Sequence, residues 1–135
     1  MTPRTMRRIY LREAALMLLL ARVAVRFLPS AWLFDWADRP IKKPRRFTAD
    51  EANWVTWSIE HMVTLPGMNA VCLPRALAAH SMLRRRGIAS RLCLGVARND
   101  GNVSAHAWIE VGERKLVGGE EAGRFTPLAA FGGVK

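Results

Sequence analysis

Residues 72–98, CLPRALAAHSMLRRRGIASRLCLGVAR, and residues 105–111, AHAWIEV, decide the fold that this sequence predicts. The first part of the stretch has a helical apolar spacing and ends in three arginines before Gly87, a residue type that commonly closes a helix. From Ser90 the apolar period changes to two, as in a half-buried strand. Turn-forming residues at 98–101 and 112–113 separate this strand from two more, at 103–111 and 114–117. We therefore expect a helix followed by an antiparallel sheet.

Pro74 fixes where this helix begins. Proline is harmless only in the first helical turn, where its missing N–H would have no intrahelical partner. Cys72, two residues earlier, must then lie at or within the helix N-terminus. Unpaired backbone N–H groups at that position lower the pKa of a thiol and can stabilise an oxyanion. Cys72 is therefore a candidate nucleophile, although an arbitrary cysteine is more often a small buried hydrophobe, as we expect for Cys93.

His106 is the candidate base, because it lies on the middle expected strand, on the same face as Trp108 and Glu110. A third group must orient its imidazole. A two-residue turn at 112–113 pairs His106 with residue 119 and favours Glu121, whereas a three-residue turn pairs it with Glu120. Glu110 lies roughly 13 Å along the strand and is a poor orienting group. The alternative is a purely structural histidine.

The N-terminal segment predicts one long amphipathic helix that ends at Pro29. Its longest uninterrupted apolar run, residues 14–21, is too short to span a bilayer, and the flanking charges argue against a signal peptide. One line along the helix carries Arg4, Arg8, Arg12, Arg22 and Arg26, and the apolar residues Ile9, Leu16, Leu20, Val23 and Phe27 lie off that line. We expect the apolar side to pack on the rest of the protein. The alternative is a docking surface for a partner or a membrane face.

Three further segments complete the expected architecture. Residues 30–47 predict a short helix and a basic connector, and residues 49–64 predict a helix with Thr48 as N-cap, stopped by Leu65-Pro66-Gly67. His61 on that helix is expected to be a partly exposed structural residue. The glycine-rich tail after residue 117 predicts a loop with one turn of helix.

Composition restricts the class of protein. A chain of 135 residues that is 50% hydrophobic suits one packed domain over 1–135, with a helical part at 1–66 and a helix-and-sheet part at 67–135. Two cysteines exclude a disulfide scaffold and favour the reducing cytosol. The sequence lacks the spacing of metal ligands among Cys72, Cys93, His80 and His106. No cofactor is expected. A net charge of +10, mostly arginine, indicates an anionic partner.

The residues at 72–98 and 105–111, the Leu65-Pro66-Gly67 before the cysteine and the terminal FTPLAAF closely resemble the transglutaminase-like cysteine peptidases of lasso-peptide biosynthesis, the protease half of maturation protein B. The resemblance covers residues 8 to 131. It implies an α+β, transglutaminase-like or papain-like fold, in which N-terminal helices and a central helix pack on a small antiparallel sheet. It further implies that Cys72 is the nucleophile and His106 its base. In the family an Asp completes the triad about a dozen residues after the histidine. Here Glu120 and Glu121 stand there, and Glu120 is the expected third member. The alternative is that a backbone carbonyl or a water molecule fills the third role.

The same resemblance implies the biological role and the partners. Such enzymes remove the leader from a lasso-peptide precursor before a separate ATP-dependent cyclase closes the macrolactam. No leader-binding domain is visible in the chain, so a separate recognition protein is expected to deliver the precursor. The first helix, the basic connector, Trp32 and Trp36 are its candidate contacts.

Two alternatives of other classes remain. A transglutaminase-like transferase or an inactive scaffold would keep the fold without the peptidase reaction. A module that binds nucleic acid or another anionic surface would explain the charge. The chain has no helix-turn-helix or zinc signature, however, and no aromatic residue is interleaved with its arginine runs.

Overall fold

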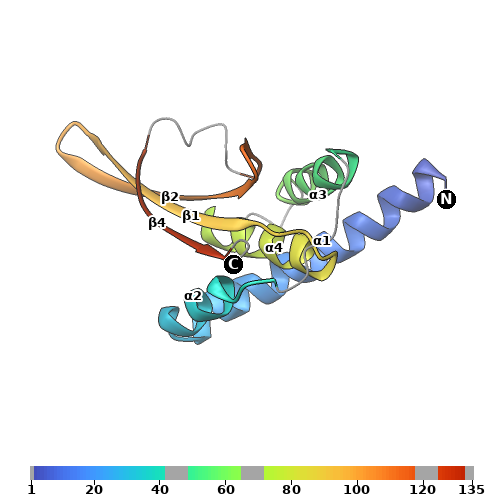
Figure 1. Ribbon diagram of the computed structural model, residues 1–135, viewed down its shortest axis with the longest axis horizontal. Helices are drawn as coiled ribbons and strands as arrows, with labels where there is room; N and C mark the ends of the chain where they lie inside the picture. Colours follow the sequence, from blue (N-terminus) through green and yellow to red (C-terminus); the bar gives the residue numbers. More distant parts are fainter. Residues whose placement is uncertain (1, 42–48, 65–71, 118–124, 133–135) are drawn as a thin grey trace.

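The computed structural model describes residues 2–41, 49–64, 72–117 and 125–132. Four helices precede four strands in the described part of the chain (Figure 1). The helices are α1 (Pro3–Phe27), α2 (Ser30–Asp38), α3 (Ala49–Met62) and α4 (Cys72–Arg85). The strands are β1 (Arg91–Asn99), β2 (Asn102–Val111), β3 (Arg114–Lys115) and β4 (Thr126–Gly132). The predicted α+β class is confirmed.

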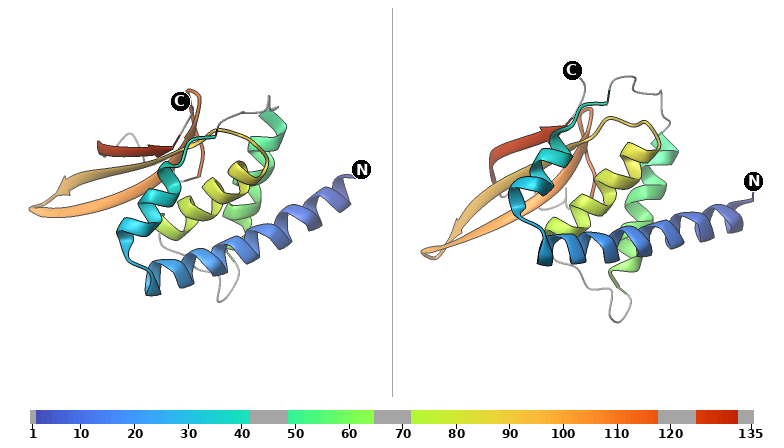
Figure 2. Two further views of the ribbon diagram at one scale, coloured as in Figure 1. Left: turned by 60° about the horizontal axis from the view of Figure 1, so that its bottom comes forward. Right: turned by 90° about the horizontal axis from the view of Figure 1, so that it is seen from below.

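Helix α4 lies between the sheet on one side and α1 and α3 on the other (Figure 2). Its N-terminus is where Pro74 predicted it, with Cys72 as the first helical residue. Its C-terminus closes at Gly87, which has a φ of 73°. There the backbone N–H of Ile88 donates to the carbonyl of Leu83, and that of Gly87 donates to the carbonyl of Arg84. Most of the helix is buried: Pro74, Ala76, Leu77, Ala78, Ala79, His80, Met82 and Leu83.

The strands form one antiparallel sheet in the order β3-β2-β1-β4. A two-residue turn at Asp100 and Gly101, both with positive φ, joins β1 to β2, as in the tight hairpins whose twist matches that of the strands. Along β2, Ala107, Ile109 and Val111 belong to the main core on the helix side. Trp108 belongs instead to a second cluster with Cys93 and Phe125. The predicted alternation of β2 is therefore confirmed, and it separates two layers of side chains.

The prediction for the tail was wrong. Residues expected to form a loop and one helical turn instead form β4, which pairs with β1 at the opposite edge of the sheet from β3. Pro127 is compatible with this strand because β4 is an edge strand, where a missing N–H interrupts no inner ladder. Its partner is Gly95, next to a register shift between Leu94 and Gly95.

The expected packing face of the first helix was also wrong. The residues of α1 that are buried are Tyr10, Ala14, Leu18 and Ala21. The side named in the sequence analysis is exposed, including Leu16, Leu20 and Phe27. The helix has apolar residues on two faces, and the face with two alanines is the one that approaches α3 and α4.

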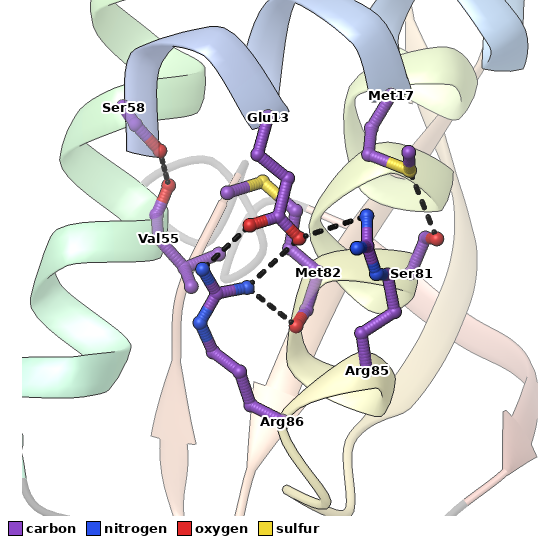
Figure 3. Close-up of polar contacts among 8 residues, drawn as sticks. All are labelled: Glu13, Met17, Val55, Ser58, Ser81, Met82, Arg85 and Arg86. Atoms are coloured by element: carbon purple, nitrogen blue, oxygen red, sulfur yellow. Dashed lines mark hydrogen bonds and ion pairs between the residues drawn. The ribbon is translucent and has the colours of Figure 1, made fainter. Parts of the chain in front are cut away.

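A charged contact reinforces the packing of α1 on α4. Glu13 of α1 accepts hydrogen bonds from Arg86 at 3.0 and 2.5 Å and forms an ion pair with Arg85 (Figure 3). The Arg86 guanidinium also lies 4.4 Å from the ring centroid of Tyr10. Because Glu13 and Arg86 are both mostly buried, this bidentate pair fixes how the two helices align.

His80 is the buried polar residue of α4. Its Nε2 lies 2.9 Å from the carbonyl oxygen of Ala37, and its Nδ1 lies 2.7 Å from the hydroxyl of Ser90. A carbonyl can only accept, so Nε2 carries the proton and Nδ1 accepts from Ser90. The neutral ring thus joins α4, α2 and the start of β1. Burial lowers the pKa of His80 to about 4, an effect that the hydrogen bond to Ala37 opposes and the Arg84 charge adds to.

No helix in the described ranges combines the length and the apolar character needed to cross a membrane.

We expect acid to destabilise the fold through His80. In the unfolded chain His80 binds a proton near pH 6.5, but in the native state only near pH 4, so unfolding is favoured as the pH falls between these values. The loss should approach about 3 kcal/mol near pH 4. Urea unfolding of the wild type and of His80→Gln between pH 7.5 and 4 measures it. The two proteins share every other titratable group. An identical pH dependence of the free energy of unfolding in both would therefore contradict the assignment of this effect to His80.

Candidate functional site

Cys72 is placed by the start of α4. It is the first residue of the helix, its thiol is free, and its side chain is partly exposed and packs against the main core. Pro74 is buried in the same turn. Because proline has no backbone N–H, this residue cannot donate a helical hydrogen bond. The first backbone N–H groups of a helix have no intrahelical partners, which makes this a suitable place for an attacking thiolate and for the oxyanion it creates.

His106 is placed by β2 and by aromatic rings. Its side chain is 8% exposed, and its ring stacks on Phe125 at 4.9 Å and on Trp108 at 6.0 Å between centroids. Both rings lie nearly parallel to the imidazole, at 25° and 24°. The histidine is therefore held as a flat layer between two apolar surfaces, which restricts rotation of its ring.

Gly95 makes this aromatic layer possible. It pairs with His106 across the β1–β2 ladder. A Cβ atom at Gly95 would lie 2.9 Å from two ring carbons of Trp108 and 3.0 Å from the carbonyl oxygen of Thr126. Those distances are too short for any side chain, so glycine is required where the indole crosses β1.

Glu110 is occupied by groups other than His106. Its carboxylate accepts from Trp108 Nε1 at 2.9 Å and pairs with Arg91 at 2.6 Å. Burial raises the pKa of Glu110, but hydrogen bonds from Trp108 and Cys93 and the positive charge of Arg91 outweigh this, and the net shift is downward. Glu110 thus remains an anion that anchors the indole beside His106.

The two cysteines differ in chemistry. Cys93 is buried in the layer with Trp108, and burial together with the nearby Glu110 charge raises the pKa of its thiol to about 12. A thiol with that pKa is almost entirely protonated at neutral pH and is a poor nucleophile. The prediction that Cys93 is a structural residue agrees with this position.

The register between β2 and β3 bears on the third member of the site. Val111 pairs with Arg114, so the turn at Gly112 and Glu113 has two residues. Beyond it, Ile109 accepts from the N–H of Leu116 and donates to the carbonyl of Val117. Two residues therefore oppose one, which is a β-bulge and shifts the register by one residue. Glu120 and Glu121 themselves lie outside the described residues.

Helix α4 packs against β2, and the described contacts place Cys72 and His106 in different layers of the protein. The contacts described for the two side chains are with different groups: Cys72 contacts the helix-side core, and His106 contacts the aromatic layer. The pairing of thiol and imidazole stays a prediction. His61 is exposed and stacks on Trp57, and His80 is engaged with Ala37 and Ser90.

Sequence reasoning missed the aromatic enclosure of His106. The alternation of β2 placed Trp108 on the His106 face, but nothing in the spacing of the tail indicated that Phe125 would stack on the imidazole. Within the described residues, no three His, Cys, Asp or Glu side chains gather in a group that could hold a metal ion.

Comparison with known families assigns the fold independently. A model of the transglutaminase-like superfamily matches residues 15–130, a range that includes both Cys72 and His106. No curated protein and no solved structure matches the chain.

We expect Gly95→Ala to disturb His106 indirectly. The added methyl group would force the Trp108 ring away from β1, and the imidazole would lose one of its two stacking partners. Overpacking of this kind typically costs about 1–3 kcal/mol of stability. The NMR chemical shifts of the His106 ring protons should change in Gly95→Ala, because the ring current of Trp108 moves with its indole. Ala97→Gly, which opens space on the same strand, is the control, and unchanged His106 ring-proton shifts in Gly95→Ala would contradict the positioning role.

Proposed function

The chain belongs to the transglutaminase-like superfamily, and on that basis we propose that it is a cysteine peptidase that removes the leader peptide from a lasso-peptide precursor. The observation that carries the proposal is the position of Cys72 as the first residue of a helix packed on the strand that bears His106. The resemblance of residues 72–98 and 105–111 to the lasso-peptide peptidases supports the choice of substrate.

The proposed reaction has two steps. His106 takes the proton of Cys72, and the thiolate attacks the carbonyl carbon of the scissile peptide bond, forming a tetrahedral oxyanion near the helix N-terminus. The C–N bond then breaks, and His106 returns the proton to the leaving amine, which is the new N-terminus of the core peptide. Water, activated by His106, hydrolyses the thioester and releases the leader with a free carboxylate.

Glu120 is the proposed orienting group for His106. A carboxylate that accepts from one ring nitrogen leaves the other free to act as base. The register supports Glu120 over Glu121, because the extra residue at Leu116 and Val117 has the same effect on pairing as the three-residue turn that favours Glu120. The engagement of Glu110 with Arg91 and Trp108 removes the nearest competitor.

The proposal includes partners. A separate leader-recognition protein would bring the precursor to Cys72, and an ATP-dependent cyclase would use the amine that cleavage exposes. Tethering by the recognition protein raises the effective concentration of the precursor, so its benefit would be greatest at low substrate. The reaction needs no cofactor or metal, and the cytoplasm is the proposed location.

A transferase is the second candidate, since the same thioester can be attacked by an amine in place of water. Product analysis separates the two: hydrolysis leaves a carboxylate on the leader, whereas transfer leaves an amide.

We expect Cys72→Ala to abolish leader removal while leaving the fold intact, because a partly exposed first-turn thiol contributes little buried volume. Cys93→Ala is the matched control and should retain cleavage, provided that it folds. Mass spectrometry of a precursor peptide incubated with each variant measures the outcome. Cleavage by Cys72→Ala, or activity lost only in Cys93→Ala, would overturn the assignment.

Alkylation is a second test of Cys72 as the reactive thiol and requires no substrate. Iodoacetamide at neutral pH should modify Cys72 in the native protein and spare Cys93, whose thiol is buried and protonated. In urea both residues should react, which controls for the reagent.

Replacing Glu120, the proposed orienting residue, should distinguish an effect on the tautomer of the His106 imidazole from an effect on geometry. Glu120→Gln keeps the shape but introduces a donor, which favours the wrong imidazole tautomer, so kcat should fall by about 10²–10⁴-fold. Glu121→Gln should retain most of the activity. Single-turnover leader cleavage by both variants decides between them, and near wild-type rates in both would mean that neither glutamate orients His106.

A further inference from the structure

We propose that the outward face of α1, together with the start of α2, is a docking surface for an anionic lipid membrane. This inference is independent of the peptidase reaction. We name the surface the α1 stripe and define it by its large apolar side chains, which are Leu16, Leu20, Val23, Phe27 and Trp32.

The α1 stripe is exposed although it is apolar. Phe27 is 75% exposed, Trp32 is 63% exposed, and Leu16, Leu20 and Val23 are each about half exposed. At 100° per residue, the α1 members of the stripe share one side of the helix, roughly opposite to the buried Tyr10, Ala14, Leu18 and Ala21. A run of this kind along one helix differs from scattered surface apolar residues and marks an interaction site.

An apolar groove extends the stripe toward α2. It has a volume of about 330 Å³, and the residues that line it include Met17, Leu20, Leu28, Trp32 and Trp36. The residues that line the groove belong to α1, α2 and α4. Helix α1 is followed by α2 at one corner of the molecule (Figures 1 and 2). The stripe therefore combines protruding side chains with a recess that can accept an acyl chain.

The charges beside the stripe determine which occupant fits. Arg8, Arg12 and Arg26 are exposed along one flank of α1. Glu13, the only acidic residue of α1, is bound to Arg85 and Arg86, and Asp35 on α2 is the nearest other acid in sequence. A second copy of the chain would bring like charges together. A lipid surface with uniform negative charge complements the arginines, whose aliphatic stems can lie along the stripe while their guanidinium groups reach phosphates.

The placement of apolar, cationic and aromatic side chains also resembles that of an interfacial helix. Such helices lie in the membrane plane with an apolar face toward the acyl chains, cationic residues on the polar boundary and aromatic residues at the headgroup level. Phe27 at the end of α1 and Trp32 in the first turn of α2 supply the aromatic residues.

Vesicle sedimentation of the full chain tests the proposal. We expect the wild type to sediment with vesicles of equal parts phosphatidylcholine and phosphatidylglycerol, and much less with phosphatidylcholine alone. Leu20→Ser combined with Phe27→Ser should weaken the partition about tenfold or more. The matched control is Val103→Ser combined with Leu128→Ser, which replaces two equally exposed apolar residues of the sheet and should have no effect.

A second pair of variants separates local charge from net charge. Arg12→Gln with Arg26→Gln should weaken binding to the anionic vesicles, and more so than Arg98→Gln with Lys115→Gln, which removes the same charge from exposed positions on the sheet. Circular dichroism verifies that each variant is folded. The proposal is overturned if the wild type does not sediment with anionic vesicles, or if stripe and sheet variants behave alike. It is also overturned if the stripe variants keep vesicle binding and lose only a protein partner.

Discussion

The burial of α4 on most of its circumference is the constraint on which the rest of the structure depends. A helix in that position cannot be satisfied by one neighbour, and here it is enclosed by α1 and α3 on one side and by β2 on the other. Alanine at three of the buried positions lets these elements approach closely, and His80 is accepted because both of its nitrogens have partners. Within this enclosure the two ends of α4 have fixed positions, with Cys72 at one end and Gly87 at the other.

The candidate site depends on this enclosure and on the outer layer of the sheet. Trp108 organises the outer layer, because it crosses β1 at Gly95, donates to Glu110 and stacks on His106. This stacking restrains the imidazole through residues that take no part in the proposed reaction. A general base requires supporting contacts of this kind, because an imidazole that rotates freely would spend little time in the reactive geometry.

Much of the fold could be predicted because local signals agree with tertiary packing. Pro74 and Gly87 bound α4 by backbone chemistry alone, and the alternation along residues 105–111 divided β2 correctly between two layers. The position of Cys72 at the start of α4 followed from Pro74, and the superfamily match agrees with the fold that the resemblance implied. Cys93 was recognised as structural, but the strength of its protonation depends on Glu110 and on burial, which only the assembled sheet reveals.

Other features could not be predicted, for identifiable physical reasons. Helix α1 is apolar on two faces, and periodicity does not say which one is buried. The face that contains Ala14 and Ala21 is buried, while Leu16, Leu19 and Leu20 are exposed. The strand β4 was hidden by Pro127 and by flanking glycines, which have low strand propensity, and it forms because β1 offers an unpaired edge. The bulge at Leu116 and Val117 has no turn signal in the sequence, yet it sets the register that bears on Glu120.

Pro127 has a consequence for how an extended peptide can approach this protein. Enzymes that act on unfolded substrates often hold them by adding a strand to an open sheet edge, with main-chain hydrogen bonds as the main attraction. On β4 that attraction is interrupted at Pro127, which has no N–H to offer and is exposed at the edge of the sheet. The same interruption discourages two copies of the chain from joining their sheets edge to edge. An extended peptide is therefore disfavoured as a further strand at this edge of the sheet.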